Sequence, residues 1–174
     1  MNTSHIASVI DRWSSRVDAV SDAAGATPDG YVPPVTFLET KAYTNAPNDL
    51  LMEYLLTVAR HTGRYGRLSH VCASLQKAHS ALLDECRALY MKAMRPKKYV
   101  KDEMMLWVYS NVPKFSNLQE VYVSKLIPVQ GQIEGIAKEC ETVYKALSRI
   151  VELRKNQTGP VSGINMTSRR NVRR

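Results

Sequence analysis

Residues 68–89, LSHVCASLQKAHSALLDECRAL, place apolar residues at alternating intervals of four and three. This period is that of a heptad seam, the stripe along which one helix packs against another. The seam positions are Leu68, Cys72, Leu75, His79, Leu82, Cys86 and Leu89. His79 is the one polar member, and a histidine in such a position is more typical of packing or register than of a metal ligand. The stretch therefore predicts a long, packed helix.

A second heptad seam lies in the C-terminal part of the chain, at Tyr122, Leu126, Val129, Ile133, Ile136, Cys140, Val143, Leu147 and Ile150. Pro128 is expected to kink this helix or to lie in its first turn, and Gly159 with Pro160 ends it. Two such helices joined by about 30 residues predict an antiparallel helical hairpin. We expect surplus apolar faces on both seams to hold a homo-oligomer.

The first long helix should begin near Asn48, with Asp49 in its first turn, where the helix dipole favours an acid. Within it, the sequence GRYG contains Gly63 and Gly66. Each glycine costs a helix about 1 kcal/mol relative to alanine, so we expect a bend or a break there. Pro96 ends the helix, and residues 98–111 are predicted to form a short one.

The flanks divide the chain into three parts. Residues 1–47 hold an amphipathic helix (4–22), which either packs on the body or acts as a docking arm, and a Pro/Gly connector. Residues 48–157 form the helical, oligomerising and nucleic-acid-binding domain. Residues 158–174 form a disordered basic tail, a secondary and dispensable contributor to binding. The predicted fold class is all-α, a helical hairpin with an N-terminal helical arm.

The composition excludes several classes of protein. An apolar fraction of 44% and a charged fraction of 23% are those of a globular chain. Three cysteines without CxxC argue against a disulfide framework and a zinc module. The chain has no signal-peptide pattern and no apolar stretch of membrane length, so a reducing cytoplasm fits best. No nucleotide-binding or catalytic motif occurs, so we expect a binding protein without metal or cofactor, not an enzyme.

Positive charge is concentrated in residues 60–101, which hold ten basic and two acidic side chains, a net charge of +8. Tyr65, Tyr90 and Tyr99 lie among them. Basic groups neutralise phosphates and aromatics stack on unpaired bases, so the pattern favours single-stranded DNA. It fits equally a solvated helix face with core tyrosines. The candidate contacts are Arg60, Arg64, Arg67, Lys77, Arg87, Lys92, Arg95, Lys97 and Lys98.

Two segments resemble a known family. NDLLMEYLLTVARHTGRYGRLSHVCASLQKAHSALLDECRALYMKA (48–93) and YVKDEMMLWVYSNV (99–112), followed by the second seam, are similar to the UvsY-like recombination mediators of T-even-like bacteriophages. The N-terminal helix and the basic tail have no counterpart, and GRYG interrupts the family's long helix. The nearest counterparts of the family's basic contacts are Lys77, Arg87 and Lys92.

The resemblance implies a ring-like homo-oligomer that binds single-stranded DNA in the cytoplasm of an infected bacterial host. Its partners would be a phage recombinase and the single-strand binding protein that coats the DNA, with no cofactor and no membrane. Two alternatives remain: a structural or assembly component of a phage particle (portal, neck or internal protein), and a small RNA-binding or regulatory helical protein. Salt-sensitive binding to bare single strands would distinguish the mediator from the virion component.

Overall fold

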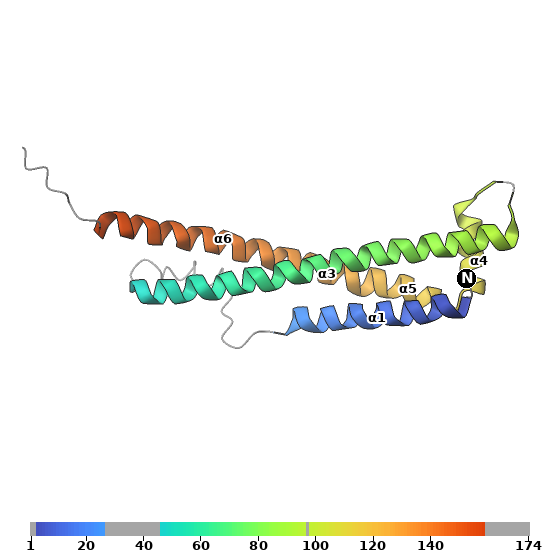
Figure 1. Ribbon diagram of the computed structural model, residues 1–174, viewed down its shortest axis with the longest axis horizontal. Helices are drawn as coiled ribbons and strands as arrows, with labels where there is room; N and C mark the ends of the chain where they lie inside the picture. The colour runs from blue at the N-terminus through green and yellow to red at the C-terminus, as the bar shows by residue number, and fades with distance from the viewer. Residues whose placement is uncertain (1–2, 27–45, 97, 159–174) are drawn as a thin grey trace, which may run out of the picture.

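The computed structural model describes residues 3–26, 46–96 and 98–158, and its regular elements there are all helical (Figure 1). They are α1 (Thr3–Gly25), α3 (Asn48–Met94), α4 (Lys101–Asn111), α5 (Phe115–Val121), the π-helical turn η2 (Tyr122–Leu126) and α6 (Ile127–Thr158). The predicted all-α class is therefore confirmed. Most of the predicted connector, the basic tail and Lys97 lie outside the described residues.

The predicted helical hairpin is confirmed, because α3 and α6 run side by side in opposite directions along most of the rod (Figure 1). Both seams are buried between them. In α3 the buried seam residues are Cys72, Leu75, His79, Leu82 and Cys86, and in η2 and α6 they are Leu126, Ile133, Cys140, Val143 and Leu147.

Most seam residues face each other and α1 within one chain, which leaves little of the surplus apolar surface expected for a second subunit. Assembly through the seams is untested and stays a prediction. Aspartate at Ile136 or Val143 would bury a charge inside the chain itself, so such variants report on folding and not on assembly.

α3 runs unbroken through GRYG, so the expected break there is wrong. The first seam extends further toward the N-terminus than the heptads alone indicated, through the buried residues Leu51, Val58, His61 and Tyr65. Burial of these side chains on both sides of Gly63 and Gly66 outweighs the helix cost of the two glycines.

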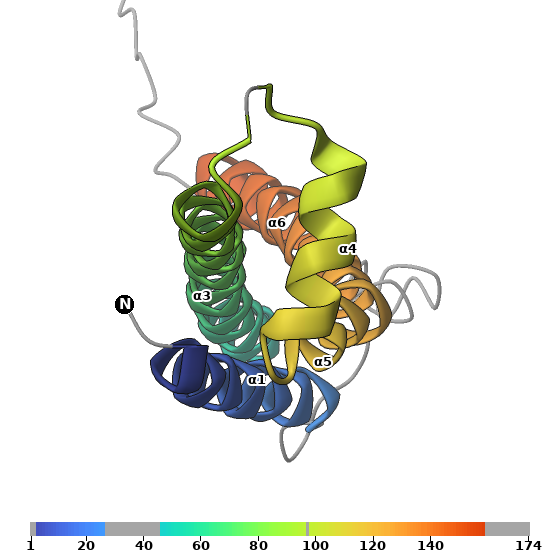
Figure 2. The ribbon, with the colours of Figure 1, turned by 90° about the vertical axis from the view of Figure 1, so that its right-hand side faces the viewer.

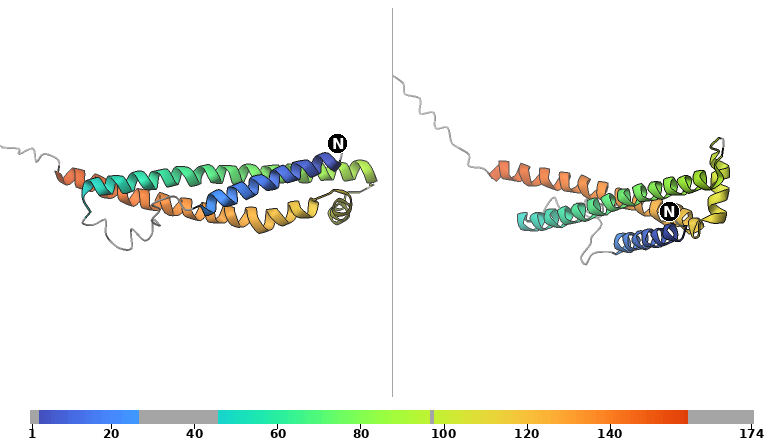
Figure 3. Two further views of the ribbon diagram at one scale, coloured as in Figure 1. Left: turned by 90° about the horizontal axis from the view of Figure 1, so that it is seen from below. Right: turned by 45° about the vertical axis from the view of Figure 1, so that its right-hand side comes forward.

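The N-terminal helix α1 packs on the hairpin rather than extending from it (Figure 3). Its buried face consists of Ile6, Ile10, Trp13, Val17 and Val20. The Trp13 indole Nε1 donates a 2.9 Å hydrogen bond to the Leu75 carbonyl oxygen. At its edge, Asp11 pairs with Lys114, and Asp18 accepts a 2.6 Å hydrogen bond from Lys125. Both ion pairs are about half exposed, so the apolar face contributes most of the docking energy.

α1 covers only the part of the rod nearest α4, which lies across the end (Figures 1 and 2). Beyond it, the start of α3 and the end of α6 form a two-helix section with its own core cluster around Leu51, Val58, Cys140, Val143 and Leu147. Arg154 joins the two helices there by donating hydrogen bonds to the Ala46 carbonyl (2.6 Å) and to Asn48 Oδ1 (3.1 Å).

Pro128 lies in the first turn of α6, as expected, and the helix continues across it from α5. Proline has no N–H to donate, and its ring crowds the carbonyl four residues earlier. The preceding turn η2 is wider than an α-helical turn, and the Ile127 N–H bonds to the Tyr122 carbonyl, five residues back. The π-helical turn thus accommodates the proline in a nearly continuous rod.

His79 is buried where four elements meet. Its ring stacks on Tyr122 with centroids 3.9 Å apart, and the Trp13 ring lies 5.7 Å away. The Gln119 amide nitrogen is 3.4 Å from His79 Nε2. Burial disfavours the imidazolium and lowers the pKa of His79 below its ordinary 6.5. A neutral, stacked His79 therefore belongs to the folded state.

Acidification is expected to destabilise the protein through this histidine. Below pH 6.5 the unfolded chain binds a proton at His79 that the folded chain does not bind, so the free energy of unfolding falls as pH is lowered. Burial and the Arg64 charge lower the pKa of His61 also, and His61 adds to the same slope. Urea unfolding between about pH 7 and pH 5.5 measures this. His79→Gln should make the free energy of unfolding depend less on pH, whereas the control His70→Gln, at an exposed position of α3, should not. An unchanged pH dependence in His79→Gln would contradict the assignment to His79.

Candidate nucleic-acid interface

The basic residues of 60–101 do not form one patch. Arg67 and Arg95 are 28 residues apart on α3, which at the helical rise separates them by about 42 Å. Arg60, Arg64 and Arg67 lie near the middle of the rod, and Lys77 is exposed alone between the two groups. The other group surrounds the turn from α3 into α4, and we name it the basic corner: Arg87, Lys92, Arg95, Lys98 and Lys101.

Arg64 is a structural residue. Its guanidinium Nη2 donates hydrogen bonds to the carbonyls of Ala23 (2.7 Å) and Ala26 (3.2 Å), at the C-terminus of α1. Carbonyls in the last turn of a helix lack partners within it, and a cation there also complements the helix dipole. Arg64 is thus engaged in docking α1, whereas Arg60 and Arg67 are exposed. Its candidacy as a DNA contact is not supported by this geometry.

The basic corner is a continuous basic stretch of the sequence, because no acidic residue occurs from Arg87 to Lys101. α3 ends at Met94, and the next residue, Arg95, has a left-handed φ of 44° and an N–H that bonds to the Met91 carbonyl. The chain then turns through Lys98 and Tyr99 into α4, at the end of the rod (Figure 2). The Arg87 guanidinium lies over the Tyr99 ring, 4.4 Å from its centroid. This arrangement places a cation on a partly exposed aromatic ring within a basic stretch of the chain.

Tyr65 and Tyr90 do not stack on bases, contrary to the expectation from sequence. Each is only 3% exposed, and both belong to the core. The Tyr90 hydroxyl lies 3.5 Å from Glu103 Oε2, and its ring meets Trp107 edge-on. Burial, and then the Glu103 carboxylate, raise the pKa of Tyr90. Of the three tyrosines, the partly exposed Tyr99 is the one left for stacking.

The corner also exposes apolar side chains. On α3 these are Met91 and Met94, and beyond the turn they are Val100 and Leu106, of which Leu106 is 70% exposed. Exposed methionine and leucine beside basic residues are a chemistry suited to a protein partner as well as to nucleic acid.

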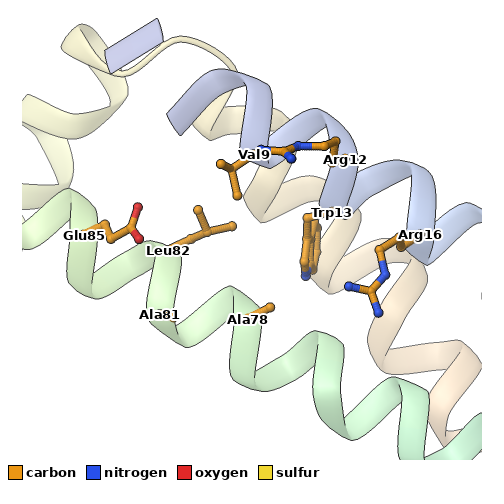
Figure 4. A pocket seen from close by; sticks show the side chains of 8 residues that line it. All are labelled: Val9, Arg12, Trp13, Arg16, Ala78, Ala81, Leu82 and Glu85. Carbon is orange, nitrogen blue, oxygen red and sulfur yellow. The ribbon is translucent and has the colours of Figure 1, made fainter. Parts of the chain in front are cut away.

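A cavity of about 410 Å³ lies between α1 and α3 (Figure 4). It is lined by Val9, Arg12, Trp13 and Arg16 from α1 and by Ala78, Ala81, Leu82 and Glu85 from α3. Glu85 Oε2 is buried and has no hydrogen-bond partner among the described residues. The lining includes no serine, cysteine or histidine, so it offers no nucleophile with an adjacent base.

Arg12 and Arg16 add positive charge to the lining of this cavity and were not among the residues predicted from the sequence. They lie in an N-terminal segment of net negative charge, and their four-residue spacing, which places both on one helix face, was the signal that could have found them.

Metal and thiol chemistry find little support in the described part of the chain. Within it, no group of three His, Cys, Asp or Glu side chains is placed to hold a metal ion. Cys72, Cys86 and Cys140 are free and buried. Burial, with the nearby Glu85 charge, raises the pKa of Cys86 to about 11. Such thiols carry almost no thiolate at neutral pH and act as apolar core residues.

Replacing Arg64 by alanine should loosen α1. The carbonyls of Ala23 and Ala26 would lose a charged donor, a loss of about 1 kcal/mol at this partly buried position. Hydrogen exchange of the α1 amides should accelerate, and the midpoint of unfolding should fall. Lys77→Ala, an exposed cation on the same helix, is the control and should change neither. Unaltered exchange in Arg64→Ala would show that Arg64 does not hold α1.

No described helix is long and apolar enough to cross a membrane. No protein-family model matches the chain, and no match was found among curated proteins or among solved structures. The geometry of the basic corner and the sequence resemblance are therefore the grounds on which a function is proposed.

Proposed function

We propose that the protein binds single-stranded DNA through the basic corner and acts as a recombination mediator, which helps to load a phage recombinase onto DNA coated by single-strand binding protein. The observation that carries the proposal is the corner itself. Five described cations occur from Arg87 to Lys101 with no acid between them, and one of them, Arg87, lies over the partly exposed Tyr99 near the end of the rod. Such a site attracts a phosphate backbone and offers a ring to an unpaired base.

A single strand suits the corner better than a duplex. The cations lie at the end of α3, in the turn that follows it and at the start of α4. A flexible strand can follow such a path, and its unpaired bases are free to stack on Tyr99 or on the Arg87 guanidinium. The bases of a duplex are already stacked and paired, so a duplex would gain only the phosphate contacts.

The mediator role rests on the resemblance to UvsY-like proteins, whose matching segments fall on α3, α4 and α6. In this role the protein works by binding and assembly rather than by catalysis, in the cytoplasm of an infected host. A mediator has to contact protein as well as DNA. The exposed Met94, Val100 and Leu106 beside the corner supply an apolar surface for such a partner.

A structural or assembly component of a phage particle is the second candidate. The same apolar side chains favour it, because subunits of a particle are held mainly by protein contacts. For this candidate the basic corner is a solvated surface with no preference for single strands. DNA binding by the purified chain therefore separates the two.

Charge reversal at the corner should remove most of the binding. We expect the triple variant Arg87→Glu, Lys92→Glu and Lys98→Glu to bind a short labelled single strand at least about tenfold more weakly, because about three phosphate contacts are lost. Fluorescence anisotropy over a salt series measures this, and the slope of log affinity against log salt should shrink by about 2. Circular dichroism should show unchanged helicity, since the three side chains are exposed.

The matched control is Arg60→Glu, Arg67→Glu and Lys77→Glu, which makes the same change in charge at three exposed positions of the same helix. On a strand short enough to contact one chain, this variant should keep nearly the wild-type affinity. Tyr99→Ala should weaken single-strand binding and leave duplex binding unchanged. Equal losses in both triple variants would mean that net charge alone attracts DNA, and no loss in the corner variant would favour the virion component.

A further inference from the structure

The outer face of α3 between residues 49 and 67 has features that no contact within the described chain explains. We use outer face for the positions opposite the buried seam, at helical spacing: Asp49, Met52, Glu53, Leu56, Ala59, Arg60, Gly63, Gly66 and Arg67. Met52 is 41% exposed and Leu56 is 55% exposed, one helical turn apart. Burying them against another surface would be favourable.

Beyond Met52 and Leu56, the outer face of α3 carries two glycines with open space above them. At Gly63 and Gly66 an added Cβ would meet nothing within 4 Å. Each glycine costs the helix about 1 kcal/mol, and no close contact within the described chain requires either of them. A second helix lying on this face could approach closely over Ala59, Gly63 and Gly66. Larger side chains of that second helix would then fill the space above the glycines.

The charges on this part of α3 indicate what that second helix is. On the outer face, Asp49 and Glu53 are followed by Arg60 and Arg67, with no basic residue among positions 49–59 and no acid among positions 60–67. Two copies of this segment in antiparallel orientation place the acidic half of each against the basic half of the other. A parallel pair would set like charges together, and an unrelated partner would not require this antisymmetry.

We propose that the outer face of α3 is a two-fold interface with a second copy of this chain. An antiparallel pair centred between Ala59 and Arg60 sets Leu56 over the partner's Gly63 and Glu53 beside the partner's Arg67. The interface lies in the two-helix section and the adjoining turns of α3, where α3 has fewer neighbours (Figure 3). It does not use the seams, which the chain buries internally.

The pairing fixes the shape of the assembly. Each basic corner is about 35 residues of helix from the two-fold axis, or about 52 Å, so the two corners would lie about 100 Å apart at opposite ends of a long dimer. A two-fold contact of this kind closes on itself and yields a dimer. A ring would need an additional, different contact.

The first test measures mass. Sedimentation of the full chain over the micromolar range should show a concentration-dependent dimer, and Leu56→Asp should be a monomer with unchanged helicity. Ile127→Asp is the matched control, because Ile127 is exposed to a similar extent (46%) on the other long helix; it should dimerise like wild type. A wild-type monomer throughout, or a Leu56→Asp variant of unchanged mass, would overturn the proposal.

The second test uses the charges. A Glu53→Arg chain has a wholly basic charged rim along positions 53–67, and an Arg60→Glu, Arg67→Glu chain has a largely acidic one. Each alone should fail to dimerise, and an equimolar mixture should form a heterodimer. No heterodimer on mixing, or undiminished dimers of either variant alone, would overturn the proposal. Neither test involves DNA, so failure of the proposed function would leave these results unchanged.

Discussion

The antiparallel packing of the two heptad seams is the contact on which the rest of the molecule depends. It aligns α3 with α6 and holds the long helix straight enough to cross two glycines without breaking. It also creates the groove in which α1 lies, with Trp13 bonded to the backbone of α3. Because α3 is held along its length, its C-terminal end and the turn into α4 project from a supported rod rather than from a mobile loop. The cations of the basic corner are therefore carried on a supported backbone, which favours the phosphate contacts proposed for them.

The basic residues of 60–101 are close together in the sequence but are spread along α3 and beyond its end. Over 42 residues the net charge of +8 suggests one site, yet the rise of α3 spreads these residues over a length greater than a small DNA-binding surface. The arginines near the middle serve the protein itself. Arg64 closes the end of α1, and Arg60 with Arg67 forms the basic half of the proposed self-complementary face. At the corner, Arg87 lies over the partly exposed ring of Tyr99.

The helices could be predicted from the sequence more fully than the contacts that their side chains make. A strict four–three period over several heptads leaves few alternatives to packed helices, so the all-α class, the hairpin, the start near Asn48 and the position of Pro128 followed from it. The partners of each side chain did not. Tyrosine is amphipathic, and spacing alone did not separate the core residues Tyr65 and Tyr90 from the partly exposed Tyr99. The bond from Arg64 to α1 joins segments 41 residues apart in the chain, across a connector whose path no local pattern specifies. Nor did the seams reveal that α1 and the hairpin would bury most of their positions within one chain.

Hydrogen–deuterium exchange of the full chain, with and without a saturating single strand, locates the DNA contact without any substitution. If the basic corner binds the strand, exchange should slow at the end of α3, in the turn and in the first turn of α4, residues 87–104, with little change in residues 49–67. Protection confined to the middle of α3, or no protection at the corner under conditions where the strand is bound, would contradict binding at the corner.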